Sequence, residues 1–284
     1  MKNHILDAIV SPLNITEKNT INESGEIIPS KRLTLNQSMI YKSSNTSVNG
    51  RVMKDKISPI MYGHALLHLI HYIVACHEKY TNKRILLSKF DLKSAYRRCH
   101  MTYDIAIQSF TQDPTLNIAM LTLRLTFGGA PNPNSFGLVS ENICDLANHF
   151  LSNTKWNHNK FISPIQDQVP PIESPNEDSP FAQALLIIVD VPTDQKVHAK
   201  IYIDDFMVVV VDIDDNATRT NKAIHFAIHI MGRPFSHEPT TRKDLISSEK
   251  LAAEAGQNEI KRNLGWNINT RNLSIALPTD KAKA

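Results

Sequence analysis

The stretch Ile201-Tyr202-Ile203-Asp204-Asp205-Phe206, which continues into the valines at 208–211, is the strongest structural signal in this chain. β-prone residues stand on both sides of an Asp-Asp pair, which predicts a hairpin whose tip carries two adjacent carboxylates. Two neighbouring negative charges repel each other, and a divalent cation or a cationic ligand would neutralise them. An ordinary solvated Asp-Asp turn is the alternative, so the pair alone does not identify a site.

Two further segments carry related signals. The apolar run at 85–90 ends on Asp91 and changes to a helix-compatible stretch that carries Tyr96 and two arginines. Residues 123–136 form a glycine- and proline-rich turn that opens a helix, with Asn134 or Ser135 as the expected cap. If the strand that ends on Asp91 lies beside the hairpin, three carboxylates meet in one place.

In this order, the three segments resemble motifs A, B and C of the reverse transcriptases, and residues 202–205 have the YxDD form of motif C. The amino-acid sequence of these motifs is most similar to that of the enzymes of eukaryotic retroelements, in particular the DIRS-like group. The resemblance extends upstream to residues 32–38 and 47–52. Downstream, residues 263–266 are similar to the primer-grip motif E, so the resemblance covers nearly the whole chain.

Strands mixed with helices, and hairpins instead of a regular βαβ alternation, predict an α+β fold with an antiparallel sheet and helices packed on one face. The resemblance implies the right-hand description of polymerases, with fingers and palm and with a thumb that is absent or truncated. Fingers are expected at 1–84 and 104–131, and palm at 85–103 and 132–284. The second palm part would contain a proline-rich, exposed insertion at 152–180, the motif C hairpin at 200–211 and the primer-grip-like segment at 263–277.

Local patterns give the expected elements. Apolar residues at helical spacing predict helices at 62–80, 135–151 and 217–231, and a charge-rich helix at 244–262. Strands are expected at 184–191 and 200–211, and a hairpin at 105–125 whose turn contains Asp113-Pro114.

By resemblance, the chain is an RNA-directed DNA polymerase of a retrotransposon that adds deoxynucleotides to a primer 3′ end. Such a reaction gathers several negative charges, which two Mg²⁺ ions about 3.5 to 4 Å apart neutralise. Asp91 and Asp204 are the expected bridging ligands and Asp205 the supporting carboxylate, while Leu92 offers its backbone carbonyl. Because these ligands are hard oxygen donors, Mg²⁺ is the expected cofactor and Mn²⁺ its substitute.

The resemblance also implies roles in substrate binding, each with an ordinary structural alternative. Tyr96 would contact the incoming sugar and exclude a 2′-hydroxyl, or it would pack in the core. Phe127 and Gly128 would lie beneath the nucleotide and template, where a glycine permits close backbone approach. Arg32 would grip the triphosphate through its planar donors, or it would be an exposed strand arginine. Tyr202 of the YxDD motif completes the expected substrate contacts.

Two further roles follow from the same resemblance. Lys250 is the candidate for the motif D lysine that protonates the pyrophosphate, and Lys243 and Lys261 compete with it. The primer grip would consist of Leu264, Gly265 and Trp266, although Trp266 is equally compatible with a place in the core.

A competing metal site comes from the histidines of the helix expected at 62–80. His64, His68 and His71 fall at i, i+4 and i+7, with His77 and Cys76 nearby, and this spacing is compatible with a transition metal. No glutamate of the HExxH kind follows His64, and no distant Cys/His pair completes the set. An amphipathic helix surface is therefore favoured over zinc.

Composition restricts the class without naming it. The net charge of +3 is mild, so the chain is not a generic polycation. The three cysteines form no CxxC pair, and no apolar run approaches the roughly 18 residues of a membrane span. We expect an intracellular, nuclear or cytoplasmic protein with no membrane partner.

The expected partners are an RNA or DNA template with a primer, deoxynucleoside triphosphates, and other domains of a retroelement polyprotein. Two alternatives remain open. A metal-dependent nuclease would also gather aspartates around Mg²⁺, although Tyr202 and the Gly128-Gly129 pair have no evident task in a hydrolase. The other alternative is an inactive or domesticated remnant that binds nucleic acid.

Overall fold

A computed structural model describes residues 9–22, 24, 26–40, 46–57, 64–113, 115–175, 180–182, 196–232, 237 and 245–282. The chain divides into two compact units, which are described separately. The first unit consists of Met1–Thr20, Ile27–Ile60 and Ser94–Val139, and the second of Ile21–Glu26, Met61–Lys93 and Ser140–Ala284. The strand expected at 184–191 and Lys243 lie outside the described residues.

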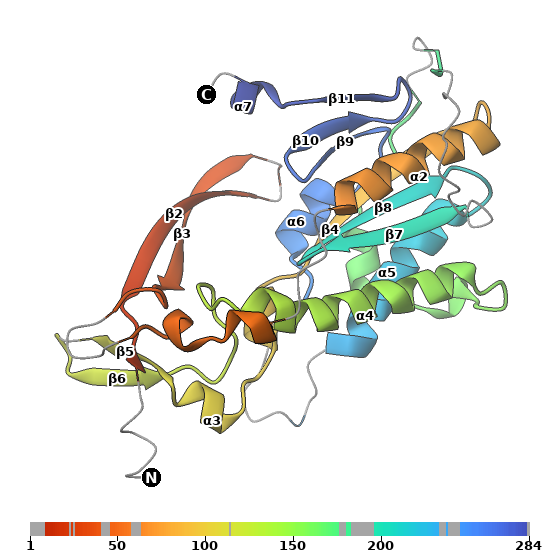
Figure 1. The fold of residues 1–284 in the computed structure, drawn as a ribbon. Coiled ribbons are helices and arrows are strands. Elements are labelled where there is room, and N and C mark those ends of the chain that lie inside the picture. The colour runs from red at the N-terminus through yellow and green to blue at the C-terminus, as the bar shows by residue number, and fades with distance from the viewer. Residues whose placement is uncertain are drawn as a thin grey trace. The chain divides into compact units, whose positions relative to one another are not determined.

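The sheet that matters most belongs to the second unit (Figure 1). Its strand order is β4 (Ile85–Asp91), β8 (Asp205–Val211) and β7 (Val197–Tyr202), and both pairings are antiparallel. The register of β4 and β8 runs from Ile85 opposite Val211 to Asp91 opposite Asp205. The apolar hairpin at 200–211 therefore lies beside the strand that ends on Asp91.

Helices cover both faces of this sheet. Helix α2 (Ala65–Lys79) packs with Leu87 and Val209 on one face. Because side chains alternate along a strand, Phe90 points to the other face, where its ring contacts His225 of α5 (Asn216–Gly232) at 5.3 Å. The prediction of helices on one face only is wrong. The continuous apolar run of β8 from Phe206 to Val211 is typical of a sheet that is buried on both sides.

Helix α4 (Asn132–Ser152) protects one edge of the sheet. Within the described residues β7 is an edge strand, and Asn148 of α4 pairs with it. The Asn148 amide donates to the Ala199 carbonyl oxygen at 2.9 Å, and the Ala199 N–H donates back to Asn148 Oδ1 at 2.9 Å. One side chain thus replaces a neighbouring strand at this position.

The C-terminal part of the second unit forms a second sheet, with the strand order β11 (Ser274–Ala276), β10 (Trp266–Asn269) and β9 (Ile260–Asn263). Helix α6 (Ser248–Glu254) precedes it and α7 (Thr279–Ala282) follows it. The prediction of one helix over 244–262 is wrong, because α6 ends at Glu254 and residues 260–263 form β9. Gly256, which weakens a helix, stands between the two elements.

The proline-rich segment packs partly against α5. Its turns η5 (His158–Lys160) and η6 (Pro164–Gln168) include the buried His158, and Gln166 hydrogen-bonds to His225. The Arg219 guanidinium of α5 donates to backbone carbonyls in and just after the end of α4. The expectation of a wholly exposed insertion is therefore wrong for this part of the segment.

The first unit contains two small β-structures. One is a sheet in which β1 (Ile9–Val10) is parallel to β5 (Ser109–Asp113), and β5 is antiparallel to β6 (Ile118–Leu121). The other is the ribbon of β2 (Leu13–Ile21) and β3 (Ile27–Leu35). The short helical elements are η1 (Asn49–Arg51), η2 (Lys54–Lys56), η4 (Ala95–Arg98) and α3 (Tyr103–Ala106).

The expected hairpin at 105–125 corresponds to β5 and β6, and Ile105 belongs to α3 instead. The expected helices at 62–80, 135–151 and 217–231 correspond to α2, α4 and α5. None of the helices in the described part of the chain combines the length and the apolar character that a membrane span requires.

Candidate active site

The ends of β4 and β8 bring the predicted carboxylates together. Asp91 lies opposite Asp205 at the last position of the pairing, and Tyr202 faces Asp205 from β7. Asp204 occupies the turn between β7 and β8, after Ile203 with its positive φ of 58°. The Leu92 N–H donates to the Asp204 carbonyl oxygen at 3.3 Å, which ties the turn to the end of β4.

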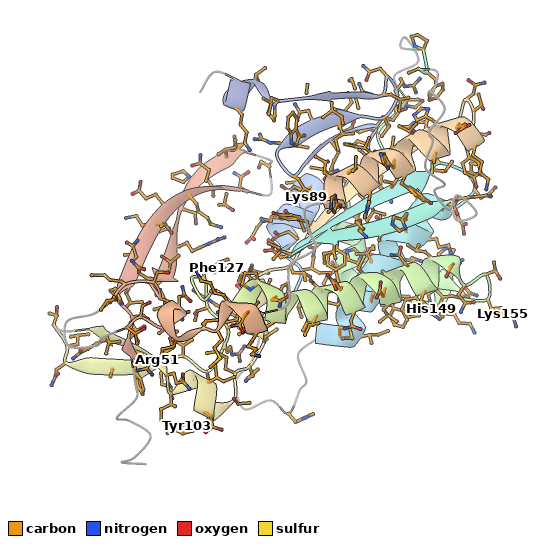
Figure 2. The ribbon with its side chains drawn as sticks, in the orientation of Figure 1. Arg51, Lys89, Tyr103, Phe127, His149 and Lys155 are labelled. Atoms are coloured by element: carbon orange, nitrogen blue, oxygen red, sulfur yellow. The ribbon has the colours of Figure 1, made fainter. Side chains whose placement is uncertain are left out.

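Two lysines contact these carboxylates. Lys250 of α6 places Nζ 2.8 Å from Asp91 Oδ1, and Lys89 of β4 places Nζ 3.2 Å from Asp205 Oδ1 and 3.5 Å from Glu254 Oε2. Figure 2 labels Lys89 on β4, in the region of α6. Strand β4 and helix α6 thus face each other with alternating charges.

The spacing of residues in β4 and in α6 explains these alternating ion pairs. Lys89 and Asp91 are two residues apart on one face of β4, and Lys250 and Glu254 are one turn apart on α6. Each lysine meets a carboxylate of the other element, so the charges of Lys89 and Asp91 are partly compensated although both side chains are largely buried.

Negative charge is not fully compensated at the hairpin tip. Burial, followed by the charges of Asp91 and Asp205, raises the pKa of Asp204 to about 6. Burial also raises the pKa of Asp91, against the opposing effect of Lys250. A neighbouring cation would favour the ionised form of both groups.

The three aspartates offer the kind of ligands that a magnesium ion takes. Among the described residues, no group of three or more His, Cys, Asp or Glu side chains is arranged as a ready-made metal cage. Mg²⁺ usually takes only one or two carboxylates and completes its shell with substrate phosphates and water. Asp91, Asp204 and Asp205 fit such an ion in kind, because they are oxygen donors at one sheet end and Asp204 is poorly compensated.

The competing lysines take different places. Lys261 lies in β9, donates from Nζ to the Gly256 carbonyl oxygen at 2.8 Å, and has a pKa that burial lowers to about 8. Of the two described candidates, Lys250 is the one whose Nζ forms an ion pair with Asp91.

The predicted substrate-binding residues of the first unit form one cluster. The Arg32 guanidinium lies over the Phe127 ring, 4.4 Å from its centroid. Phe127 meets the buried Tyr96 edge to face at 4.8 Å, and Tyr96 meets Phe136 at 5.4 Å. The cation–π contact and the aromatic contacts hold Arg32, Phe127 and Tyr96 in fixed relation to one another.

Gly128, next to Phe127, has a backbone conformation that favours glycine. Its φ is +106°, and a Cβ atom would collide with the Leu35 carbonyl oxygen at the end of β3. Glycine therefore lets the backbone after Phe127 approach β3 closely.

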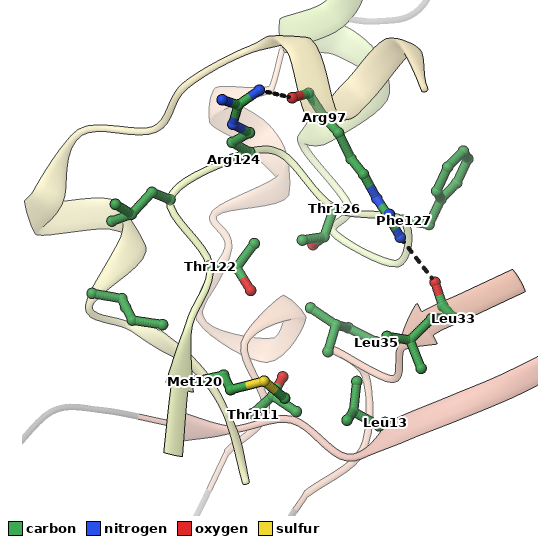
Figure 3. A pocket seen from close by; sticks show the side chains of 12 residues that line it. Leu13, Leu33, Leu35, Arg97, Thr111, Met120, Thr122, Arg124, Thr126 and Phe127 are labelled. Atoms are coloured by element: carbon green, nitrogen blue, oxygen red, sulfur yellow. Dashed lines mark hydrogen bonds between the residues drawn. The ribbon is translucent and has the colours of Figure 1, made fainter. Parts of the chain in front are cut away.

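A cavity of about 490 Å³ lies within the first unit (Figure 3). Leucines of β2 and β3 line it together with Met120, Phe127 and the side chains of Arg97 and Arg124. Arg124 donates to the Arg97 carbonyl oxygen at 2.9 Å, and Arg97 donates to that of Leu33 at 3.5 Å. None of the three site aspartates lines this cavity, so its size does not mark the acidic site.

The residues predicted for the primer grip occupy a tight turn of the second unit. Leu264 and Gly265 connect β9 to β10 with φ values of 48° and 84°, as in a two-residue hairpin turn of type I′. Trp266 opens β10 and is 37% exposed, so it is not a core tryptophan.

Sequence reasoning missed Lys89, Glu254 and Asn49. Lys89 could have been found from the two-residue period of β4, and Glu254 from the helical spacing to Lys250. Asn49 lies in a segment noticed only for its resemblance, and its contacts with residues 128–130 are long-range.

Comparisons with known proteins agree with this geometry at the level of the fold. No protein-family model matches the chain, and neither does any curated protein. Among solved structures, a foamy viral protease-reverse transcriptase in complex with double-stranded DNA is similar, with a TM-score of 0.53 and 13% identity over 97% of this chain. The chain has a reverse transcriptase-like fold.

This chain spans 32% of the foamy viral protein. At 13% identity, the likeness to a reverse transcriptase shows the fold alone. A telomerase from Candida tropicalis, truncated from its C-terminal domain, matches over 79% of this chain and 41% of its own length with 11% identity. Its TM-score of 0.39 is too low to carry an argument.

Proposed function

We propose that this chain is an RNA-directed DNA polymerase that extends a primer 3′ end with deoxynucleotides. The observation that carries the proposal is the register of β4 and β8, which sets Asp91 opposite Asp205 beside the turn that holds Asp204. The reverse transcriptase-like fold supports the same reading. The substrate would be a primed RNA or DNA template with deoxynucleoside triphosphates.

In the proposed reaction, Asp91 and Asp204 would hold the metal ions, and Asp205 and the Leu92 carbonyl would support them. Two Mg²⁺ ions, or Mn²⁺ in their place, would activate the primer hydroxyl and stabilise the pyrophosphate. Lys89 keeps Asp205 in place through its ion pair. Lys250 supplies a proton to the leaving pyrophosphate, and its contact with Asp91 supports that assignment.

The remaining roles concern substrate placement. Arg32 grips the triphosphate, while Tyr96 excludes a ribose 2′-hydroxyl. Their mutual contacts with Phe127 support a shared substrate surface in the first unit. Gly128 and Tyr202 complete the nucleotide contacts, and Leu264, Gly265 and Trp266 hold the primer end.

The biological setting follows from the motif wording. The chain would belong to a eukaryotic retroelement of the DIRS-like group and act beside other domains of a polyprotein. The comparisons give no support to this narrower assignment, which stays a prediction from the sequence.

A primer-extension assay tests the proposal. The wild-type protein is incubated with a homopolymer RNA template, a DNA primer, deoxynucleotides and Mg²⁺ or Mn²⁺. We expect extension, and a loss of roughly 1,000-fold or more in Asp91→Asn and Asp204→Asn, because each loses a carboxylate that neutralises developing charge. Circular dichroism should show that both variants remain folded.

Asp104→Asn, at an exposed position of α3, serves as the matched control and should extend normally. Wild-type rates in Asp91→Asn or Asp204→Asn would overturn the assignment. Degradation of the template would instead identify a nuclease, and tight binding without either reaction would identify an inactive binding protein.

A further inference from the structure

The loop that carries Phe127 and Gly128 is held by a single amide side chain. Asn49 donates from Nδ2 to the Gly128 carbonyl oxygen at 2.7 Å and accepts the Ala130 N–H on Oδ1 at 2.8 Å. Both ends of the amide are therefore used on one turn of backbone. The same Nδ2 also donates to Ser38 Oγ at 2.9 Å.

Asn49 is itself anchored to the end of β3. Its backbone N–H donates to the Gln37 carbonyl oxygen at 2.9 Å. The buried Gln37 side chain donates to Thr126 Oγ1 at 3.0 Å and to Ser109 Oγ at 3.1 Å. The loop is thus fixed at its start by Gln37 and over its glycines by Asn49.

A third amide closes the loop from the other side. The buried Asn132, at the start of α4, donates from Nδ2 to the Thr126 carbonyl oxygen at 2.7 Å. The hydrogen bonds of Gln37 and Asn132 are buried, whereas those of Asn49 are exposed, and together they favour one conformation of the loop. Phe127 is the residue whose position they determine, and Arg32 and Tyr96 both rest on its ring.

We propose that Asn49 is a positioning residue for Phe127, the centre of the proposed nucleotide-binding cluster. It holds the backbone of residues 128–130 so that Phe127 presents its ring to Arg32 and Tyr96. The kinetic effect of Asn49 rests on the proposed function. The two hydrogen bonds from Asn49 to Gly128 and Ala130, which we call the clamp, can be tested without any activity.

Hydrogen exchange tests the clamp directly. In Asn49→Ala, the Ala130 N–H loses its acceptor, so the peptide that contains residues 128–130 should exchange at least about ten-fold faster than in the wild type. Ser38→Ala is the matched control, because it removes a neighbour of Asn49 without touching the loop contacts. Equal protection of this peptide in Asn49→Ala and wild type would overturn the clamp.

Kinetics test the positioning role. If the wild type extends primers, Asn49→Ala should raise KM for deoxynucleotides about ten-fold with a smaller change in kcat, and should weaken discrimination against ribonucleotides. Asn49→Asp keeps the acceptor for Ala130 but loses the donor to Gly128, so it should recover only part of the affinity.

The outcomes separate the two proposals. Faster exchange with unchanged KM and unchanged sugar discrimination would overturn the positioning role and leave the polymerase assignment intact. Absence of extension by the wild type would overturn the polymerase assignment and, with it, the kinetic role of Asn49, whereas the exchange experiment would still decide whether the clamp exists.

Discussion

Asp204 shows how a single residue makes the acidic tip costly for the fold. Burial and two neighbouring carboxylates raise its pKa to about 6, compared with an ordinary value near 3.8. A carboxyl group whose pKa is higher in the folded than in the unfolded state binds its proton more tightly when folded. As the pH rises from 3.8 to about 6, the unfolded chain loses this proton before the folded protein does, so the free energy of unfolding falls.

We predict that Asp204→Asn stabilises the metal-free protein above pH 6. The gain should be roughly 1 to 3 kcal/mol at pH 7.5, because the charged group is removed, and it should vanish at about pH 3 and below, where Asp204 is protonated in both states. Urea unfolding in EDTA at the two pH values measures it. Asp104→Asn should show no such pH dependence, and a less stable Asp204→Asn protein at pH 7.5 would contradict the prediction.

Site residues that stand next to each other or end an apolar run could be predicted from the sequence. Contacts between residues that are far apart in the chain could not. The Asp204-Asp205 pair stands in the sequence, and Asp91 ends a visible apolar run. The contacts of Lys89 with Glu254, and of Asn49 with Gly128, join positions far apart in the chain, which no local pattern encodes.

Among the elements, α4 and α5 are joined by one arginine. Helix α4 ends at Ser152, and the Arg219 guanidinium donates to the carbonyl oxygens of Phe150, Asn153 and Trp156 at 2.9, 2.5 and 2.8 Å. The guanidinium also lies over the Trp156 ring, 5.1 Å from its centroid. The Phe150 carbonyl, in the last turn of α4, thereby gains a donor, and the two carbonyls of the following turn are tied to α5.

We predict that Arg219→Ala lowers the free energy of unfolding by about 2 to 4 kcal/mol, because three carbonyls lose a charged donor at once. Arg219→Lys should lose less, since an ammonium group still donates but lacks the planar fork. Urea denaturation followed by tryptophan fluorescence would measure both. Equal stability of Arg219→Ala and wild type would show that water replaces the arginine without cost.

Element types were predictable where the apolar period is long, as in α2, α4 and α5. The prediction failed at 244–262, because lysine, glutamate and alanine favour a helix on average. Residues Ile260–Asn263 instead form a strand that pairs with Trp266–Asn269. The Leu264-Gly265 turn that permits this pairing is a local signal, but its weight depends on the partner strand.

At the scale of the whole molecule, the second unit contains a largely buried ion network around Glu259. Glu259 Oε2 lies 3.5 Å from Arg84 Nε and 3.1 Å from Arg271 NH2, and Arg84 also pairs with Asp212 at 3.4 Å. The network connects the residue before β4, the residue before β9 and the turn after β10. It therefore links the two sheets of this unit.

We predict that Glu259→Gln lowers the free energy of unfolding by about 3 to 5 kcal/mol, because it leaves two largely buried arginines with too little negative charge. Differential scanning calorimetry should show a lower Tm for this variant. Glu141→Gln, at an exposed position of α4, is the control and should unfold like the wild type. A Tm equal to that of the wild type in Glu259→Gln would show that the network contributes nothing net.

The mixed α and β character and the reverse transcriptase-like fold were predictable from the motif order. The covering of both faces of the sheet was also readable, although the prediction overlooked it, because consecutive valines at 208–211 place apolar side chains on both faces of β8. The division into units also differs from the expected boundaries, since α2, which was expected in the fingers, packs on β4 and β8. Packing partners of a helix lie far away in the chain and leave little trace in its own period.

Asn148 also bears on the behaviour of the protein at high concentration. An uncovered strand margin can recruit strands from other molecules and start fibril growth. Because the amide of Asn148 hydrogen-bonds to both backbone groups of Ala199, a strand from another molecule cannot pair with this residue. The charge of the adjacent Lys200 also opposes such pairing. One asparagine on a helix thus acts as a gatekeeper against aggregation at this point of the sheet.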